Sequence, residues 1–352
     1  MQEEAIRATR ERLEKEGLLT PSVRLHLASH DRLAELVTGP VKAVVFNLGY
    51  LPGGDKKTVT RTGCTLAALE QALQQCREQK LKVLALVGVA GSTDFGSVDP
   101  LPELAAIARR EQIHFHVDAA WGGPTLFSPR YQGLLTGIEH ADTVTLDGHK
   151  QLLVPLGTGM LLCRQPDLMM TVKREAPYAI RATSFDQGRF TLEGTRPANA
   201  LYLDAAFQLL GQQGYAQLID ANYDRARRMA ELIDAHPAFE LMSAPVMNLL
   251  SYRCIPPHLQ GKALDEAANE QINAFNVALQ KAQRAEGHSF VSRTQRAVSR
   301  YGAQPLTLLR AVLLNPLIEE RHIRGLLDDQ LRLGSLIASQ LFDQTQQQGP
   351  VA

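Results

Sequence analysis

The chain has 352 residues, of which 45% are hydrophobic and 21% charged, and this composition indicates a folded globular protein rather than a disordered one. Basic and acidic side chains balance at 37 each, so no net field favours nucleic acid or an anionic membrane. The four cysteines are scattered without a CxxC pair, which excludes an obvious disulfide framework or zinc site and favours a reducing compartment.

The first residues lack a basic start followed by an apolar run, and the longest apolar stretches, such as Val83–Ala90, have the length of a strand. We therefore expect a cytoplasmic protein with no membrane partner, no nucleic-acid partner and no metal.

Helical and strand patterns alternate through the first half of the chain, which predicts an α/β fold with a mainly parallel sheet. Thr65 is the expected N-cap of the third helix. The expected helices are 4–17, 31–37, 65–80 and 101–111, and the expected strands are 23–28, 42–47, 83–89, 114–117 and 143–146.

The pattern becomes long and helical from about 198 to 235, and beyond Pro245 it predicts a smaller α+β domain. The last residues, 344–352, are Gln-rich and are expected to fray. In the small domain we expect strands at 248–254 and 308–314 and helices at 263–286 and 318–342.

Two motifs at the carboxyl ends of apolar runs carry the strongest chemical signal: HVDAAWGG from His116 and TLDGHK from Thr145. In an open α/β sheet this is the edge where ligands bind. Pyridoxal phosphate needs a lysine amine to form a Schiff base, and Lys150 is the candidate. It also needs a carboxylate facing its pyridine nitrogen, and Asp118 stands at a strand end. The small residue Ala120 would let a flat ring lie close to the backbone.

Each of these residues has an ordinary explanation when taken alone. An aspartate after a strand is usually a turn or cap residue, and a single lysine is usually a solvated surface charge. The occurrence of both in neighbouring strand-end motifs is what indicates a cofactor site.

These motifs resemble the group II pyridoxal-dependent decarboxylases, and within that group the glutamate decarboxylase-like and aspartate 1-decarboxylase-like bacterial enzymes. The resemblance runs from about residue 76 to 343. It implies a fold-type I large domain with a smaller C-terminal domain, pyridoxal 5'-phosphate as cofactor and a homodimer. The other stretches that carry it are VLALVGVAGST from Val83, TLEGTRP from Thr191, SFVSRT from Ser289 and LRAVLLNP from Leu309.

Carried over to this sequence, the resemblance makes Lys150 the Schiff-base lysine and Asp118 the partner of the pyridine nitrogen. It makes Ala120 the residue that packs on the ring and places Thr93 near the cofactor. His149 would contact the cofactor or the substrate.

The resemblance also implies a carboxy-lyase of amino-acid metabolism that acts on an acidic amino acid such as glutamate or aspartate. Arg181, Arg189 and Arg196 are candidate partners for the substrate's side-chain carboxylate, with a structural ion pair as the alternative for each. Trp121, the only tryptophan, is expected to pack rather than to contact substrate.

Residues 1–75 resemble a different family, the Rossmann-type methyltransferases that use S-adenosylmethionine on RNA, chiefly through FNLGYLPGGDK from Phe46. The helix 65–80 is compatible with both families, so the join is expected near 62–78. The turn that holds the cofactor phosphate in the decarboxylases, and their ring-stacking histidine, have no counterpart in residues 1–75.

We therefore predict four segments in this chain. Three functions remain open: a pyridoxal-phosphate-dependent decarboxylase, a catalytically impaired chimera that keeps the fold, and an S-adenosylmethionine-dependent RNA methyltransferase, although the Gly-rich cofactor loop of the last is absent. The segments are a methyltransferase-like Rossmann fragment (1–75), a pyridoxal-phosphate-binding large domain truncated on its N-terminal side (76–240), a small domain (241–345) and a tail (346–352).

Overall fold

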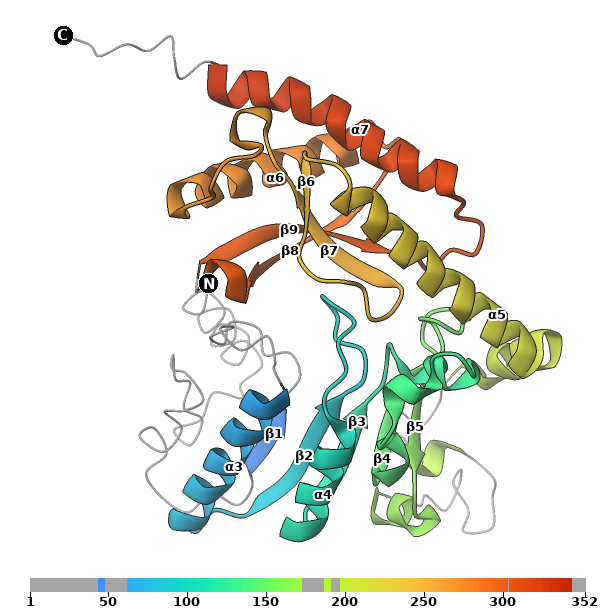
Figure 1. The fold of residues 1–352 in the computed structure, drawn as a ribbon. Coiled ribbons are helices and arrows are strands. Elements are labelled where there is room, and N and C mark those ends of the chain that lie inside the picture. Colours follow the sequence, from blue (N-terminus) through green and yellow to red (C-terminus); the bar gives the residue numbers. More distant parts are fainter. Residues whose placement is uncertain (1–43, 48–61, 173–186, 191–196, 303, 344–352) are drawn as a thin grey trace, which may run out of the picture.

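A computed structural model of the chain describes residues 44–47, 62–172, 187–190, 197–302 and 304–343. Two β-sheets with separate hydrophobic cores lie at opposite ends of the molecule, and the long helix α5 (Ala200–Asp234) runs alongside both (Figure 1). None of the described helices combines the length and the apolarity that a bilayer crossing requires.

The larger sheet has five strands in the order β1-β2-β3-β4-β5, of which β1 to β4 are parallel and β5 is antiparallel to β4. The predicted α/β architecture with a mainly parallel sheet is thereby confirmed. Its strands are β1 (Val44–Asn47), β2 (Val83–Val89), β3 (His114–Asp118), β4 (Thr143–Asp147) and β5 (Gly159–Cys163).

Helices α3 (Thr62–Glu78) and α4 (Leu101–Glu111) cover one face of this sheet. Leu86 of β2 is paired in register with Phe115 of β3, so both side chains point to this face. They pack with Leu69 of α3 and Leu104 of α4, and all four are at most 2% exposed. Each such side chain contributes roughly 1.5–3 kcal/mol through removal from water, which fixes the strands against these two helices.

Short 3-10 turns connect the larger elements after β3 and β5. They are η2 (Gly123–Phe127), η3 (Gln132–Leu135), η4 (Ile138–His140), η5 (Pro166–Val172) and η6 (Gln187–Phe190). The first, η2, lies between β4 and α5.

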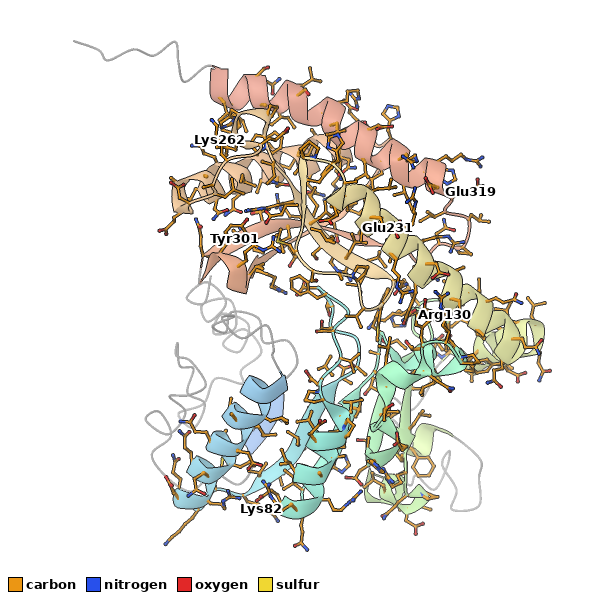
Figure 2. The ribbon with its side chains drawn as sticks, in the orientation of Figure 1. Lys82, Arg130, Glu231, Lys262, Tyr301 and Glu319 are labelled. Atoms are coloured by element: carbon orange, nitrogen blue, oxygen red, sulfur yellow. The ribbon has the colours of Figure 1, made fainter. Side chains whose placement is uncertain are left out.

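The backbone of α5 breaks at Gly211, whose φ of 59° and ψ of −173° lie in a region that glycine alone populates readily. The first half packs Phe207 near Tyr215, and the second half sends Tyr223 into the core of the large sheet and Met229 into the core of the small one. The helix therefore takes part in both hydrophobic cores. Figure 2 shows Arg130 beside α5, where its Nη1 lies 2.9 Å from Asp224 Oδ2.

The smaller sheet is antiparallel, in the order β6-β7-β9-β8, and helices α6 and α7 pack on one of its faces (Figure 1). Asp265 caps α6 by accepting the N–H of Ala268, and Gly287 ends it in the left-handed conformation. Its elements are β6 (Phe239–Leu241), β7 (Leu249–Cys254), η7 (Pro257–Leu259), α6 (Glu266–Glu286), β8 (Ser292–Ala297), η8 (Ser299–Tyr301), β9 (Pro305–Val312), α7 (Glu320–Ala338) and a final π-turn, η9 (Ser339–Asp343).

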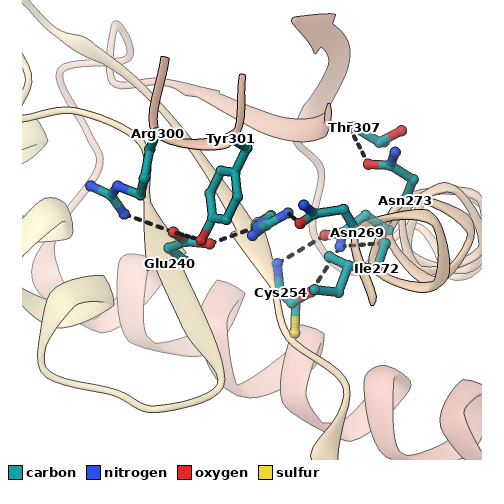
Figure 3. A network of polar contacts seen from close by, with 10 residues as sticks. Glu240, Cys254, Asn269, Ile272, Asn273, Arg300, Tyr301 and Thr307 are labelled. Atoms are coloured by element: carbon teal, nitrogen blue, oxygen red, sulfur yellow. Dashed lines mark hydrogen bonds and ion pairs between the residues drawn. The ribbon is translucent and has the colours of Figure 1, made fainter. Parts of the chain in front are cut away.

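A buried charge network holds this sheet to α6 (Figure 3). Arg253 is fully buried, and its Nε lies 2.7 Å from Glu240 Oε2 while its Nη1 donates to Asn269 Oδ1 at 2.7 Å. Arg300 and the hydroxyl of Tyr301 donate to the other oxygen of Glu240, at 2.7 and 2.6 Å. Breaking such a pair on one side leaves an uncompensated buried charge, at a cost of about 3–5 kcal/mol.

The expected elements at 83–89 and 101–111 coincide with β2 and α4. Thr65 is not an N-cap, because α3 begins three residues earlier, at Thr62. The expected elements at 4–17, 23–28 and 31–37 lie outside the described residues. The four predicted segment boundaries remain proposals.

The turn after β3 touches the turn after β2 so closely that Gly122 admits no side chain. A Cβ at Gly122 would lie 2.3 Å from the carbonyl oxygen of Ala90 and 2.7 Å from the terminal carbon of Met247. We expect Gly122→Ala to lower the free energy of unfolding by about 1–3 kcal/mol, measured by denaturant titration. Gly133→Ala is the matched control, since its Cβ would meet nothing within 4 Å. Equal stability of the two variants would contradict this packing.

Candidate active site

The carboxyl ends of β2, β3 and β4 meet at one edge of the large sheet. Val89 pairs in register with Asp118, and Asp118 pairs with Thr145. The backbone N–H of Asp147 donates to the carbonyl of Ala120 at 3.3 Å, which joins the turns after β3 and β4. All five residues predicted for the cofactor site follow these strand ends along one edge: Thr93, Asp118, Ala120, His149 and Lys150.

Asp118 is the last residue of β3 and is half-buried. Its Oδ1 accepts the backbone N–H of Ala120 at 3.1 Å, which fixes the carboxylate at the start of the turn. Within the described residues its Oδ2 accepts no hydrogen bond. One oxygen of the carboxylate is therefore available to a ligand.

Lys150 lies in the turn after β4 with its side chain 33% exposed, and its Nζ is 2.7 Å from Asp147 Oδ2. The neighbouring His149 has Nδ1 at 3.1 Å from the carbonyl oxygen of Thr158. Because a carbonyl only accepts, this nitrogen carries a proton. His149 Nε2 lies 3.8 Å from the same Asp147 oxygen. Asp147 thus orients the lysine.

Hydrogen bonds and an ion pair join the turn after β2 to strands of the small sheet. Arg310 of β9 donates from Nε to the carbonyl of Thr93 at 2.6 Å, and Asp94 forms a buried ion pair with Arg296 of β8. The hydroxyl of Ser251 donates to the carbonyl of Asp94 at 2.8 Å. These contacts fix the position of the turn that carries Thr93.

Arg310 was not among the arginines expected at the site. It is half-buried, burial lowers the pKa of its guanidinium, and it forms no ion pair with another described residue. The sequence offered one signal, its position in the LRAVLLNP stretch. Arg181 and Arg196 lie outside the described residues, and the side chain of Arg189 is likewise not described.

Trp121 joins the same two domains. Its indole N–H donates to Asn248 Oδ1 at 3.0 Å, its ring packs against the core of the large sheet, and its carbonyl accepts from Gln151 at 2.7 Å. These contacts agree with a packing role for this tryptophan.

A polar row that the sequence reading missed runs along β3 and β4 toward Asp118. His116 Nδ1 lies 2.9 Å from Thr143 Oγ1, and His116 Nε2 lies 3.2 Å from Thr145 Oγ1. His114 Nε2 is also within 2.8 Å of Thr143 Oγ1. The signal was present as histidine at every second position before Asp118 and threonine at every second position before Asp147, which places each set on one face of the sheet.

Two cavities have volumes of about 470 Å³, and neither is lined by any of the five predicted cofactor-site residues. One is lined by apolar residues of η2, η3 and β4, including Leu126 and Leu135. The other lies in the small domain between α7 and the end of β9, and Arg310 is part of its lining.

The family model for the pyridoxal-dependent decarboxylase conserved domain matches residues 55–255, more than half of the chain. The chain belongs to the pyridoxal-dependent decarboxylase family. This match contains all five predicted site residues. The family implies pyridoxal 5'-phosphate as the cofactor.

Similar proteins include the aspartate 1-decarboxylase of Aliivibrio fischeri, which is 42% identical over 286 residues, covering 79% of this chain and 52% of the relative. The L-2,4-diaminobutyrate decarboxylase of Acinetobacter baumannii is 28% identical and is covered to the same 52%, with 77% of this chain. The chain thus spans about half the length of these curated relatives. The solved structure of mouse CSAD has a TM-score of 0.70 at 26% identity and covers 76% of this chain and 56% of its own. The fold-type I assignment of this decarboxylase family member is confirmed by such neighbours.

A second family model, for an rRNA methylase, matches residues 1–93 and overlaps the decarboxylase match at 55–93. The resemblance of the N-terminal segment to a methylase family is thereby supported. The overlap covers α3 and β2, which follow β1 in a parallel strand–helix–strand unit.

The described residues of this decarboxylase family member fit the ring end of pyridoxal phosphate. Lys150 supplies an amine, Asp118 supplies a carboxylate with one open oxygen, and the turn between them carries Ala120 and two glycines, Gly122 and Gly123. The amine, the carboxylate and the small residues match the aldehyde, the pyridine nitrogen and the flat ring, respectively.

Burial lowers the pKa of His116, while the nearby Asp118 carboxylate acts in the opposite direction. The unfolded chain therefore binds a proton at His116 at a higher pH than the folded protein does. Stability is fully present above the unfolded pKa, about 6.5, and is lost as pH falls toward the lower folded pKa.

We expect His116→Gln to lose less stability than the parent protein between pH 8 and pH 5.5, because glutamine takes up no proton. Thermal unfolding at both pH values measures this, with exposed His140→Gln as control. An equal acid sensitivity in His116→Gln and the parent would refute the assignment.

Proposed function

We propose that this chain binds pyridoxal phosphate at the strand-end edge and is a pyridoxal-phosphate-dependent amino-acid decarboxylase, a carboxy-lyase. The observation that carries the proposal is the placement of Asp118 and Lys150 at the ends of neighbouring strands, joined by the hydrogen bond between the two turns. Family membership supports the same reading.

The chemistry that pyridoxal phosphate supplies when bound is withdrawal of electrons from the substrate Cα, which allows the bond to the carboxylate to break. Lys150 would hold the cofactor through its amine. Asp147 Oδ2, 2.7 Å from the Lys150 amine, would orient it and balance the positive charge of its protonated form. Asp118 would hold a proton at the pyridine nitrogen with its open oxygen, and Ala120 would pack on the ring.

His149 is proposed to contact the cofactor or the substrate through Nε2. Its Nδ1 proton is committed to the carbonyl of Thr158, so Nε2 is the nitrogen that can accept a proton beside Lys150. Thr93 would approach the cofactor from the neighbouring turn.

We propose an acidic amino acid, aspartate or glutamate, as the substrate, with Arg310 binding one of its carboxylates. Arg310 is a half-buried cation that is bonded to the carbonyl of Thr93, and the nearby Asp94 carboxylate, which acts to raise its pKa, is itself paired with Arg296. A relative at 42% identity is an aspartate decarboxylase, which supports this substrate class. A homodimer and a cytoplasmic location, both expected from the sequence, also remain proposals, and a molar-mass measurement in solution tests the first.

Borohydride trapping tests cofactor binding without requiring turnover. We expect the full chain incubated with pyridoxal phosphate to show Schiff-base absorbance and, after reduction, a covalent label on Lys150 identified by peptide mass spectrometry. Lys150→Arg keeps the charge beside Asp147 but has no amine that condenses, so its label should be lost. Asp118→Asn should weaken the dissociation constant about 10- to 100-fold, the range for a charge-assisted hydrogen bond of roughly 1.5–3 kcal/mol.

A label spread over surface lysines, or one unchanged in Lys150→Arg, would sink the proposed cofactor site. Binding of S-adenosylmethionine by the same chain would favour the methyltransferase alternative. A specific label without carbon dioxide release would favour the impaired chimera.

Arg310→Gln tests the substrate site. Loss of an ion pair at a half-buried position should weaken aspartate binding to the cofactor-loaded chain about tenfold or more, measured from the spectral change of the cofactor. Exposed Arg293→Gln, on the neighbouring strand β8, is the matched control. L-2,4-diaminobutyrate separates two cases: an equal loss places Arg310 on the α-carboxylate, and a loss limited to aspartate places it on the side chain. Unchanged binding of both would exclude Arg310.

A further inference from the structure

A continuous chain of hydrogen-bonding groups runs along one face of β3 and β4 and ends beside Asp118. Its hydrogen bonds join His114 to Thr143, Thr143 to His116 and His116 to Thr145. The Asp142 carboxylate faces His114 Nδ1 at 3.9 Å, which is an electrostatic contact and not a hydrogen bond. Thr145 is the register partner of Asp118. Helices α3 and α4 pack on the opposite face, so this row is separate from the apolar core.

The hydroxyl of Thr143 sets the proton arrangement of the row. It lies within hydrogen-bond distance of two imidazole nitrogens, Nε2 of His114 and Nδ1 of His116. A hydroxyl has one proton to donate and two lone pairs, so at most one of these nitrogens accepts from it, and when one does, the other must donate its own proton. With both rings neutral, the row therefore has two consistent arrangements that differ in direction.

Asp142 selects one of them. Its carboxylate faces Nδ1 of His114 and favours a proton on that nitrogen, which leaves Nε2 as the acceptor. Thr143 then donates to His114 and accepts from Nδ1 of His116. Nε2 of His116 is consequently a lone pair, and Thr145 donates to it.

We propose that His116 is a positioning residue that the row holds neutral and protonated on Nδ1, so that the Asp118 carboxylate keeps its full charge for the cofactor's ring nitrogen. This inference rests on the proposed role of Asp118. A protonated His116 would offset that charge, since two opposite charges this close stabilise each other. Thr145 donates its hydroxyl proton to His116 and therefore does not donate it to the Asp118 carboxylate.

The groups that surround His116 are consistent with a neutral ring. Burial lowers the pKa of His116, the Asp118 carboxylate on its own strand acts to raise it, and His114 acts to lower it. On β4 the facing groups are the hydroxyls of Thr143 and Thr145, with the Asp142 carboxylate beyond them. From β2 the register neighbour is the apolar Val87, and on β5 the thiol of Cys163 lies one strand beyond Thr143.

The tautomer is measurable in the full chain without cofactor. Long-range ¹H–¹⁵N correlation spectra of protein labelled with ¹⁵N-histidine distinguish the two tautomers, and His116→Gln assigns the signal. We expect the Nδ1-protonated form at pH 7.5, retention of it in Thr143→Ser, and loss of the preference in Thr143→Val and in Asp142→Asn. A dominant Nε2-protonated form of His116, or a tautomer preference that Thr143→Val leaves unchanged, would contradict the proposed proton arrangement.

The proposed effect of His116 on the charge of Asp118 is tested by the pH dependence of cofactor binding. A protonated ring nitrogen beside Asp118 disfavours a second proton on His116. At the acidic end of the range, where the free protein begins to take up that proton, cofactor binding should release it and therefore weaken as pH falls. Between pH 7.5 and 5.5 the dissociation constant of the parent should rise relative to His116→Gln, by up to about tenfold per pH unit, the limit for one released proton. Contributions from Lys150 and from the cofactor phosphate are common to both proteins and cancel.

Parallel pH profiles in the two proteins overturn the link between His116 and the cofactor. If neither protein binds the cofactor at any pH, the proposed function fails, and with it the purpose given to the row, while the tautomer result stands independently as a property of the sheet.

Discussion

The strand-end edge depends on one close backbone contact, between the turns that follow β2 and β3. The N–H of Gly122 donates to the carbonyl of Ala90 at 3.0 Å, at a distance that no side chain at position 122 would permit. Asp118 lies at the start of the turn after β3, and Thr93 lies in the turn after β2, so the contact holds these two residues near each other in the fold. Met247, in the connection between β6 and β7 of the small sheet, packs on both turns and so contacts the same place. Arg296 and Arg310 then attach the Thr93 turn to β8 and β9. The geometry of the edge is thus a property of both domains together.

The sequence predicted those parts of the fold whose local pattern is strong. β2 and α4 could be located because an unbroken apolar run and an amphipathic helix are visible without knowledge of their neighbours. β8 could not, since its residues Ser292–Ala297 are mostly polar and become a strand only through pairing with β9. The break of α5 at Gly211 was also missed, because the apolar pattern continues across it.

The residues of the candidate site also differ in whether a local sequence pattern predicts them. Asp118 and Lys150 follow from two motifs, since each lies at the end of an apolar run. Arg310 reaches Thr93 across a separation of 217 positions, which no local pattern records. The row of His114, His116, Thr143 and Thr145 needs the strand register, because its hydrogen bonds join residues 27 to 29 positions apart. The two family matches overlap at α3 and β2, which with β1 form a strand–helix–strand unit of a kind common to α/β folds.

The central claim is that Asp118 and Lys150 hold opposite ends of one cofactor ring. A crystal structure of the full chain soaked with pyridoxal phosphate tests it most directly. The account predicts continuous density from Lys150 Nζ into the cofactor, with the pyridine nitrogen within hydrogen-bond distance of Asp118 Oδ2. A cofactor linked to Lys150 whose ring nitrogen points away from Asp118, or one bound at another part of the molecule, would contradict it.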